Sequence, residues 1–248
     1  MLDADTRPLL AFDTSTPTAR VALISPAGEC LVLREKTAAR HSANLLALCD
    51  EILRGASVRV DELRAIACGA GPGSFTGLRV GLAVAKGLAL PSALPLVLLS
   101  SLDALACDLA AALPEQPSAQ LLLPCIDAGK GQVYARMYGV TPGAAPCALG
   151  DLDWVLAPDA LCALAAEDAA GQSLLAGGTG VDRYLEAFRA SLGETSVAAA
   201  VPGPSAAAIG RLALHRIRRD DFDDLETAVP RYGRSPDITR PKKPLLVT

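Results

Sequence analysis

The chain has 248 residues, 51% of them hydrophobic, with a formal net charge of −4 and a pI near 5.2. Phosphate contacts need an excess of lysine and arginine, so this balance argues against a protein that grips nucleic acid alone. The longest apolar run, residues 80–99, is broken by Lys86, Pro91 and Pro95, so it predicts no membrane span and no membrane partner. No basic segment precedes a long apolar one at the start, and we expect a cytoplasmic protein.

Cysteine and histidine spacing argues against a metal centre. The seven cysteines occur singly, without the close pairs of a zinc ribbon or a dithiol redox site. The two histidines, His41 and His215, each lack a second histidine three or four residues away. We therefore predict reduced thiols and no metal site built by this chain.

In chain order, short apolar runs alternate with turn residues and then with helical patterns. Period-two runs and turn clusters predict strands over residues 9–13, 19–25, 28–35, 65–68 and 96–99. Apolar residues at helical spacing predict helices over residues 42–53, 76–90 and 102–113. The order is βββαβαβα, which is typical of an α/β lobe.

The segment of residues 69–81 reads GAGPGSFTGLRVG and connects a predicted strand to a predicted helix. Its glycines permit backbone angles closed to other residues, and Ser74 or Thr76 is suited to cap the helix. Such a turn presents free N–H groups that suit either a phosphate or a loop of another protein. It is neither a Walker sequence nor a dinucleotide fingerprint, because no Gly-Lys-Ser/Thr follows and Ser74 replaces the third glycine.

The helix after this turn carries a stripe of small residues, Gly77, Gly81, Ala85 and Ala89, at four-residue spacing. Much of the remaining surface is apolar, which indicates burial on more than one side. The second covering surface is either the chain's own 42–53 helix or a helix of another chain.

The second half partly repeats the first. A strand into Ile126-Asp127, a glycine turn and a strand over 132–140 echo the start of the chain, after a link at 114–120. Residues 143–157 are predicted to be irregular, and helices are predicted near 158–169, 181–192 and 204–219. We expect two lobes, residues 1–115 with the glycine turn and 116–248 with a basic tail.

The tail concentrates positive charge in a proline-rich segment. It contains Arg231, Arg234, Arg240, Lys242 and Lys243. Either it is a solvated terminus, or it is an arm that touches RNA or an acidic partner.

The segment GAGPGSFTGLRVG closely resembles the signature of the TsaB (YeaZ) family. Further segments occur in the family's order: LLAFDTST at 9–16, RHSANLLAL at 40–48, CIDAGKGQVY at 125–134 and GGTG at 177–180. Two departures stand out. Gly129 and Gln132 replace the arginine and glutamate that family members generally carry, and Gly233 interrupts a Pro-x-Tyr-Leu-Arg segment.

The resemblance implies a two-lobed actin-like ATPase (ASKHA, ribonuclease H-like) fold with duplicated lobes. It also implies a non-catalytic subunit in the synthesis of N6-threonylcarbamoyladenosine in tRNA, which binds and activates a TsaD-type transferase. A TsaE-type ATPase is the second implied partner, a homodimer is a further option, and tRNA is expected only through the complex.

A nucleotide cleft follows from the same resemblance. Asp13 and Asp127 each end a predicted strand and precede hydroxyl or glycine residues, where ATPases of this fold hold phosphate and magnesium. The residues assigned to it are Asp13, Thr14, Ser15, Thr16, Asp127, Gly129, Gly178 and Thr179. No cofactor is certain, and ATP or ADP with magnesium at the interface of the complex is the candidate. The alternative is that Asp13 caps a turn and GGTG joins a strand to a helix.

The partner interface is assigned to the two helices and the glycine turn. Its residues are His41, Leu45, Leu48, Gly73, Ser74, Phe75, Thr76, Gly77, Arg79 and Gly81. Two rival functions stay open. One is an autonomous nucleotide-dependent phosphotransferase or ATPase, and the other is a peptidase built around Ser74, for which the sequence supplies no evident base.

Overall fold

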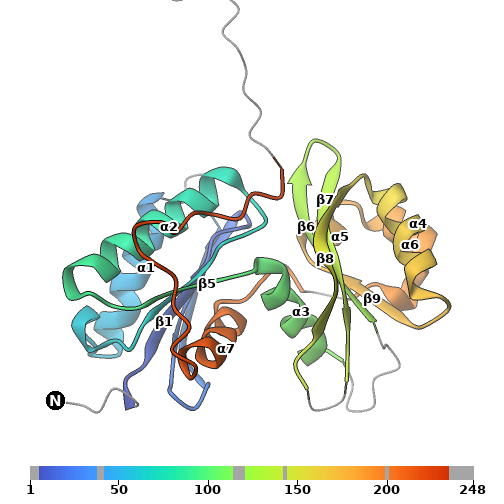
Figure 1. The fold of residues 1–248 in the computed structure, drawn as a ribbon. Coiled ribbons are helices and arrows are strands. Elements are labelled where there is room, and N and C mark those ends of the chain that lie inside the picture. The colour runs from blue at the N-terminus through green and yellow to red at the C-terminus, as the bar shows by residue number, and fades with distance from the viewer. Residues whose placement is uncertain (1–5, 38–41, 114–120, 142–143, 199–200, 235–248) are drawn as a thin grey trace, which may run out of the picture.

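The computed structural model describes residues 6–37, 42–113, 121–141, 144–198 and 201–234, which form two α/β lobes side by side (Figure 1). Each lobe is built on its own sheet, with the strand order β3-β2-β1-β4-β5 in the first and β8-β7-β6-β9 in the second. No helix among these residues is long and apolar enough to cross a membrane.

The first sheet begins as an antiparallel meander and continues with parallel strands. Its strands are β1 (Leu9–Asp13), β2 (Thr18–Ile24), β3 (Cys30–Thr37), β4 (Ile66–Gly69) and β5 (Leu96–Leu99). β1 pairs antiparallel with β2, and parallel with β4. All five residues of β1 are buried, as expected for a central strand covered on both faces.

The second sheet repeats this arrangement without the fifth strand. Its strands are β6 (Leu121–Gly129), β7 (Gln132–Gly139), β8 (Cys147–Leu156) and β9 (Leu174–Gly177). β6 pairs antiparallel with β7 and parallel with β9, as β1 does with β2 and β4. The repeated order confirms the duplicated lobes expected from the sequence.

Helices cover both faces of each sheet. They are α1 (Ser42–Gly55), α2 (Phe75–Ala89), α3 (Ser101–Ala111), α4 (Pro158–Ala169), α5 (Thr179–Arg183), α6 (Leu185–Leu192) and α7 (Ala206–Ile217). Short 3₁₀ turns are η2 (Val60–Glu62), η3 (Leu90–Ser92) and η4 (Glu194–Ser196). α1 and α2 pack on one face of the first sheet, and α4 and α6 share an apolar core with the second.

Two helices lie between the sheets and pack on the lobe opposite to the one that the sequence assigned (Figure 1). α7 falls in the expected second lobe, 116–248, but its apolar face packs on β1, β2 and β5 of the first sheet. α3 falls in the expected first lobe, 1–115, but packs on β6 in a core with Leu122 and Tyr138. Local periodicity identifies an apolar face and does not say which sheet it covers.

The strand β8 replaces the irregular segment predicted over 143–157, so that prediction was wrong. Gly150, with φ of 77°, and a register shift against β7 between Ala135 and Met137 break the strand pattern. Hydrogen bonding to β7 nevertheless holds the segment extended at the sheet edge, which single-residue preferences do not reveal.

After α7 the chain returns across the first lobe to the second, and we call residues 221–234 the strap (Figure 1). Leu225 and Ala228 pack on the core beneath α1 and α2. The backbone N–H of Arg231 donates to the carbonyl of Ala70 in the glycine turn at 2.8 Å. Beyond this point Arg234 reaches β7, where its Nη1 donates to Oε1 of Gln132 at 2.9 Å.

Candidate functional site

The turn after β1 is closed on itself. Asp13 is fully buried, and its Oδ1 accepts from the backbone N–H and the hydroxyl of Ser15 at 2.8 and 2.6 Å. Its Oδ2 accepts from the hydroxyl of Ser101, at the start of α3, at 2.7 Å. Burial raises the pKa of the Asp13 carboxyl, and the hydrogen bonds from Ser15 and Ser101 oppose that rise. The carboxyl group therefore ties the turn to α3.

The glycine turn and α2 cover this first turn at van der Waals distance. A Cβ on Gly77 would stand 2.0 Å from the carbonyl oxygen of Thr14, and one on Gly73 would stand 2.4 Å from that of Ser15. The Thr14 hydroxyl donates to the Gly77 carbonyl at 2.8 Å, and the Ser74 N–H donates to the Ser15 carbonyl at 2.7 Å. On this side, residues 14–15 therefore contact the chain's own backbone, in the glycine turn and at the start of α2.

The second aspartate is in a more open position. The backbone N–H of Asp127 donates to the Thr179 hydroxyl at 3.1 Å, and its Oδ1 accepts from the N–H of Gly129 at 3.0 Å. Its Oδ2 pairs with Arg183 at 3.0 Å. Gly178 is packed inside, where a Cβ would stand 2.4 Å from the carbonyl of Cys125. Gly178 therefore allows the close approach to the Cys125 backbone and does not line the cleft between the lobes.

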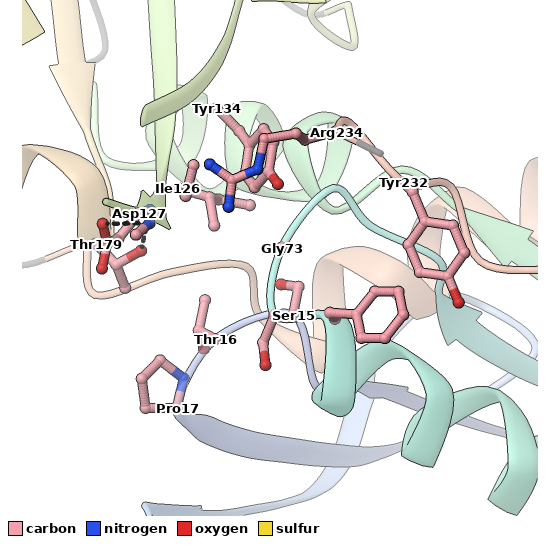
Figure 2. A pocket seen from close by; sticks show the side chains of 14 residues that line it. Ser15, Thr16, Pro17, Gly73, Ile126, Asp127, Tyr134, Thr179, Tyr232 and Arg234 are labelled. Carbon is pink, nitrogen blue, oxygen red and sulfur yellow. Dashed lines mark hydrogen bonds between the residues drawn. The ribbon is translucent and has the colours of Figure 1, made fainter. Parts of the chain in front are cut away.

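A cleft of about 460 Å³ separates the two turns (Figure 2). Its lining includes Ser15, Thr16, Pro17, Gly73, Ser74, Phe75, Ile126, Asp127, Ala128, Gly129, Tyr134, Thr179, Tyr232 and Arg234. Of the predicted nucleotide residues, Ser15, Thr16, Asp127, Gly129 and Thr179 line it, whereas Asp13, Thr14 and Gly178 do not. Two turns far apart in the sequence therefore do meet at one cleft.

Magnesium held through Asp13 does not fit this arrangement. Both carboxylate oxygens accept hydrogen bonds from the protein, and the residue has no exposed surface. Among the residues that the structure describes, no three of the His, Cys, Asp and Glu side chains gather as metal ligands. The geometry agrees with the alternative in which Asp13 caps a turn.

Ser74 caps α2. Its hydroxyl accepts from the N–H of Gly77 at 3.2 Å. The one described histidine, His215, lies in α7, on the other face of the first sheet. Within the described chain, Ser74 therefore has no histidine base beside it.

The residues predicted for the partner interface divide into buried and accessible sets. Leu45 and Leu48 are 0% and 6% exposed and belong to the lobe's own core. Gly77 and Gly81 are buried against Thr14, so the small-residue stripe packs on the chain itself. Gly73 and Ser74 are half-buried, and the exposed members are Phe75, Thr76 and Arg79. His41 lies outside the described residues.

The outward face of α1 and α2 is formed by residues that the sequence reasoning missed. Leu46 is 52% exposed on α1, and Leu90, directly after α2, is 72% exposed. Ala47, Ala83 and Gly87 are exposed between them. A groove of about 500 Å³ runs along this face and includes Leu46, Leu53, Val60 and Leu88 in its lining. The sequence signal that could have identified these exposed residues was their position next to the buried leucines in the helical pattern.

The strap supplies the other missed residues, although the sequence already shows a Pro-x-Tyr-Leu-Arg segment that Gly233 interrupts. Gly233 lies where a Cβ would stand 2.7 Å from the ring of Tyr134 and 3.2 Å from Pro72, so the departure at 233 permits a close approach. Gln132, the other departure, accepts from Arg234. At Gly129 nothing lies within 4 Å of the position that a Cβ would take, but its φ of +68° favours glycine.

Two duplicated lobes with a cleft between their strand-end turns define the actin-like ATPase (ASKHA) class of fold. In agreement, the activator of 2-hydroxyisocaproyl-CoA dehydratase from Clostridium difficile superposes with a TM-score of 0.53 at 8% identity, covering 86% of this chain and 96% of that chain. At this identity the likeness concerns the fold alone.

Closer similarities point to one family. YeaZ from Pseudomonas aeruginosa superposes with a TM-score of 0.72 at 28% identity, over 91% of this chain and 99% of that chain. The tRNA threonylcarbamoyladenosine biosynthesis protein TsaB of Haemophilus influenzae is 40% identical over 126 residues, which are 51% of each chain. Residues 32–147 match the family described as TsaD, tRNA N6-adenosine threonylcarbamoyltransferase. The chain is thus similar to proteins of the TsaB (YeaZ) family, and it spans about half the length of the curated relatives that it matches.

Proposed function

We propose that this chain is a non-catalytic subunit in the synthesis of N6-threonylcarbamoyladenosine in tRNA. In this proposal it binds a TsaD-type transferase and activates it by stabilising the productive conformation of that partner. The name of the Haemophilus influenzae relative and the TsaD family match support this pathway.

The observation that carries the proposal is the outward face of α1 and α2. Leu46 and Leu90 are exposed at 52% and 72%, and the groove is lined mostly by apolar residues, with Asp50 and Arg54 among them. Exposed large apolar side chains around a groove are typical of a protein–protein interface. The buried stripe of α2 supports the rigidity of this face, because Gly77 and Gly81 let the helix lie directly on the Thr14 turn.

The state of Asp13 supports a non-catalytic role. A carboxyl group that accepts from Ser15 and Ser101 inside the fold holds the turn and is not positioned to meet a substrate. We propose that the chemistry belongs to the TsaD-type partner. Any ATP or ADP with magnesium is proposed to bind at the interface of the complex, which would also contain a TsaE-type ATPase.

A docking experiment tests the proposal with exposed residues. Leu46→Asp and Ala83→Arg place a charge on the groove face without entering the core, and each is expected to weaken co-purification with a tagged TsaD-type protein by at least tenfold. Leu149→Asp is the matched control, because Leu149 is 45% exposed on the second lobe and its change should leave binding intact.

Thermal unfolding of each variant checks that the fold is kept. Retained binding in both groove variants would contradict the proposal. Sedimentation of the same variants without the partner also tests self-association, which should weaken in parallel if one face serves both contacts.

A further inference from the structure

A cluster of two rings and a guanidinium stands at the mouth of the inter-lobe cleft. The ring centroids of Phe75 and Tyr232 are 4.9 Å apart, and the guanidinium carbon of Arg79 lies 3.9 Å from the Phe75 centroid. Nε of Arg79 donates to the Tyr232 hydroxyl at 2.9 Å. Phe75 and Tyr232 keep 37% and 38% of their surface exposed, so the cluster is held in place and still accessible.

The guanidinium of Arg79 forms no ion pair with a carboxylate among the described residues. Exposed arginines elsewhere form close ion pairs, such as Arg34 with Glu51 and Arg189 with Glu194 at 2.7 and 3.0 Å. Arg79 contacts the two rings and makes no such pair. Arg231, two residues before Gly233 in the strap, is exposed, and the carboxyl of Asp153 acts on it only electrostatically.

The cleft beside the cluster is also lined by aromatic side chains and an arginine. Arg234 extends from the strap toward Ile126, and Tyr134 lies next to it, while Tyr232 stands at the other end (Figure 2). Together with Phe75 these residues give the cleft aromatic faces, apolar lining and a cation. A volume of about 460 Å³ lies within the range of pockets that hold ligands of nucleotide size.

We propose that this mouth, defined by Phe75, Arg79, Tyr232 and Arg234, binds an unpaired nucleotide of RNA. The base stacks on an aromatic face at the cleft, and the arginines contact the phosphates on either side, as in single-strand binding surfaces. The idea rests on the proposed function, since it names the part of the tRNA substrate that this subunit would touch within the complex.

An acidic protein segment is the rival occupant, since arginine and tyrosine are also common in protein interfaces. The observations favour RNA because the cations adjoin a cleft with several aromatic faces, whereas a carboxylate needs only the guanidinium. One or two nucleotides also agree with the net charge of −4, because so small a contact adds affinity inside a complex and does not hold tRNA alone.

The test measures binding of a fluorescent eight-nucleotide single-stranded RNA to the full chain by anisotropy at low salt. Phe75→Ala and Tyr232→Ala are each expected to weaken binding roughly tenfold, whereas Tyr232→Phe keeps the ring and should bind nearly as wild type. Arg79→Gln should reduce the slope of log affinity against log salt by about 0.7. Arg189→Gln, which removes a paired arginine of the second lobe, should change neither quantity.

Three comparison ligands decide the assignment. An abasic strand of equal charge should bind more weakly than the RNA, and a hepta-glutamate peptide and free AMP should compete poorly. Equal binding of the abasic strand or the peptide, tighter binding of AMP, or no RNA binding by the wild-type chain would each overturn the proposal.

Partner binding separates this proposal from the proposed function. Phe75→Ala and Tyr232→Ala should still co-purify with the TsaD-type protein, because Phe75 lies about two turns of α2 away from Ala83 and Tyr232 belongs to the strap. Loss of partner binding in Phe75→Ala and Tyr232→Ala would assign the cluster to the docking interface and overturn the RNA site. If Leu46→Asp and Ala83→Arg kept partner binding, the proposed function would fail, and the RNA-binding result would still stand.

Discussion

The two aspartate turns occupy equivalent places in duplicated lobes and differ in what surrounds them. Asp13 ends β1 and is fully buried, with its oxygens engaged by Ser15 and Ser101. Asp127 lies near the end of β6, lines the cleft and pairs with Arg183, whose side chain is 59% exposed. A repeated frame therefore does not imply a repeated role for its side chains.

The covering segments explain the difference. In the first lobe, the glycine turn and α2 lie directly on residues 14–15, with Gly77 at the closest point. In the second lobe, the corresponding helix α5 is only five residues long, and Gly180 faces the side chain of Val133. The turn of the first lobe is tightly packed beneath α2, whereas the turn of the second lobe is open toward the cleft.

The largest expected effect comes from adding one methyl group at the start of the covering helix. Gly77→Ala places a Cβ about 2.0 Å from a backbone carbonyl, which cannot move without shifting β1, and should lower the free energy of unfolding by about 3 kcal/mol. Gly180→Ala meets a methyl group of the Val133 side chain at 2.6 Å and should cost less, since a side chain can shift more easily than a backbone carbonyl.

Urea unfolding of both variants measures this contrast. Gly87→Ala is the control, because nothing lies within 4 Å of its Cβ and alanine favours a helix. It should raise stability by about 0.5–1 kcal/mol. Equal losses in Gly77→Ala and Gly180→Ala would contradict the interpretation that the turn of the first lobe is the more tightly packed.

A smaller effect is expected from removing each carboxyl group. Asp13→Ala leaves the donors of Ser15 and Ser101 buried without an acceptor and should cost about 2 kcal/mol. Asp127→Ala removes a partly exposed ion pair, which contributes roughly 0–1 kcal/mol. Chemical denaturation of the two variants gives both numbers, and a larger loss at Asp127 would reverse the comparison.

The smallest effect is a pH dependence of stability that comes from Asp13. Burial raises the pKa of its carboxyl above the ordinary value of 3.8, so the folded state binds a proton more readily than the unfolded state. Its contribution to the free energy of unfolding therefore increases as pH falls through the raised folded pKa, and levels off below about 3.8.

The pH prediction is read as a difference between wild type and Asp13→Asn, which cancels the shifts of other groups. Urea unfolding of both proteins between pH 7 and the acid limit of folding supplies that difference. A difference that stays constant, or that shrinks as pH falls, would show that burial does not dominate this carboxyl.

Local chemistry made much of the first lobe predictable. Strands β1, β4 and β5 and helices α1 and α2 follow from apolar periodicity and from the cap at Ser74, which accepts from the N–H of Gly77. The placement of Asp13 and Asp127 at the ends of paired strands followed from the same patterns. β8 was missed because its edge pairing to β7 outweighs a weak local preference.

The site was less predictable, because its contacts join distant segments. Ser101, 88 residues from Asp13, completes the carboxyl's hydrogen bonds, and no local pattern signals that approach. The interface residues Leu45 and Leu48 were chosen from the apolar stripe of a helix, which by its nature is the buried side. Tyr232 lies 153 residues from Arg79, whose guanidinium it holds.

The sequence by itself determined the strands, the capped helices and the glycine turn, because backbone freedom and the period of apolar side chains act over a few residues. The tertiary structure decided that α3 and α7 cover opposite lobes, and that α2 turns its small residues onto Thr14. It also brought the strap to the cleft. Burial, close approach and charge pairing depend on which surfaces meet, and that is a property of the whole fold.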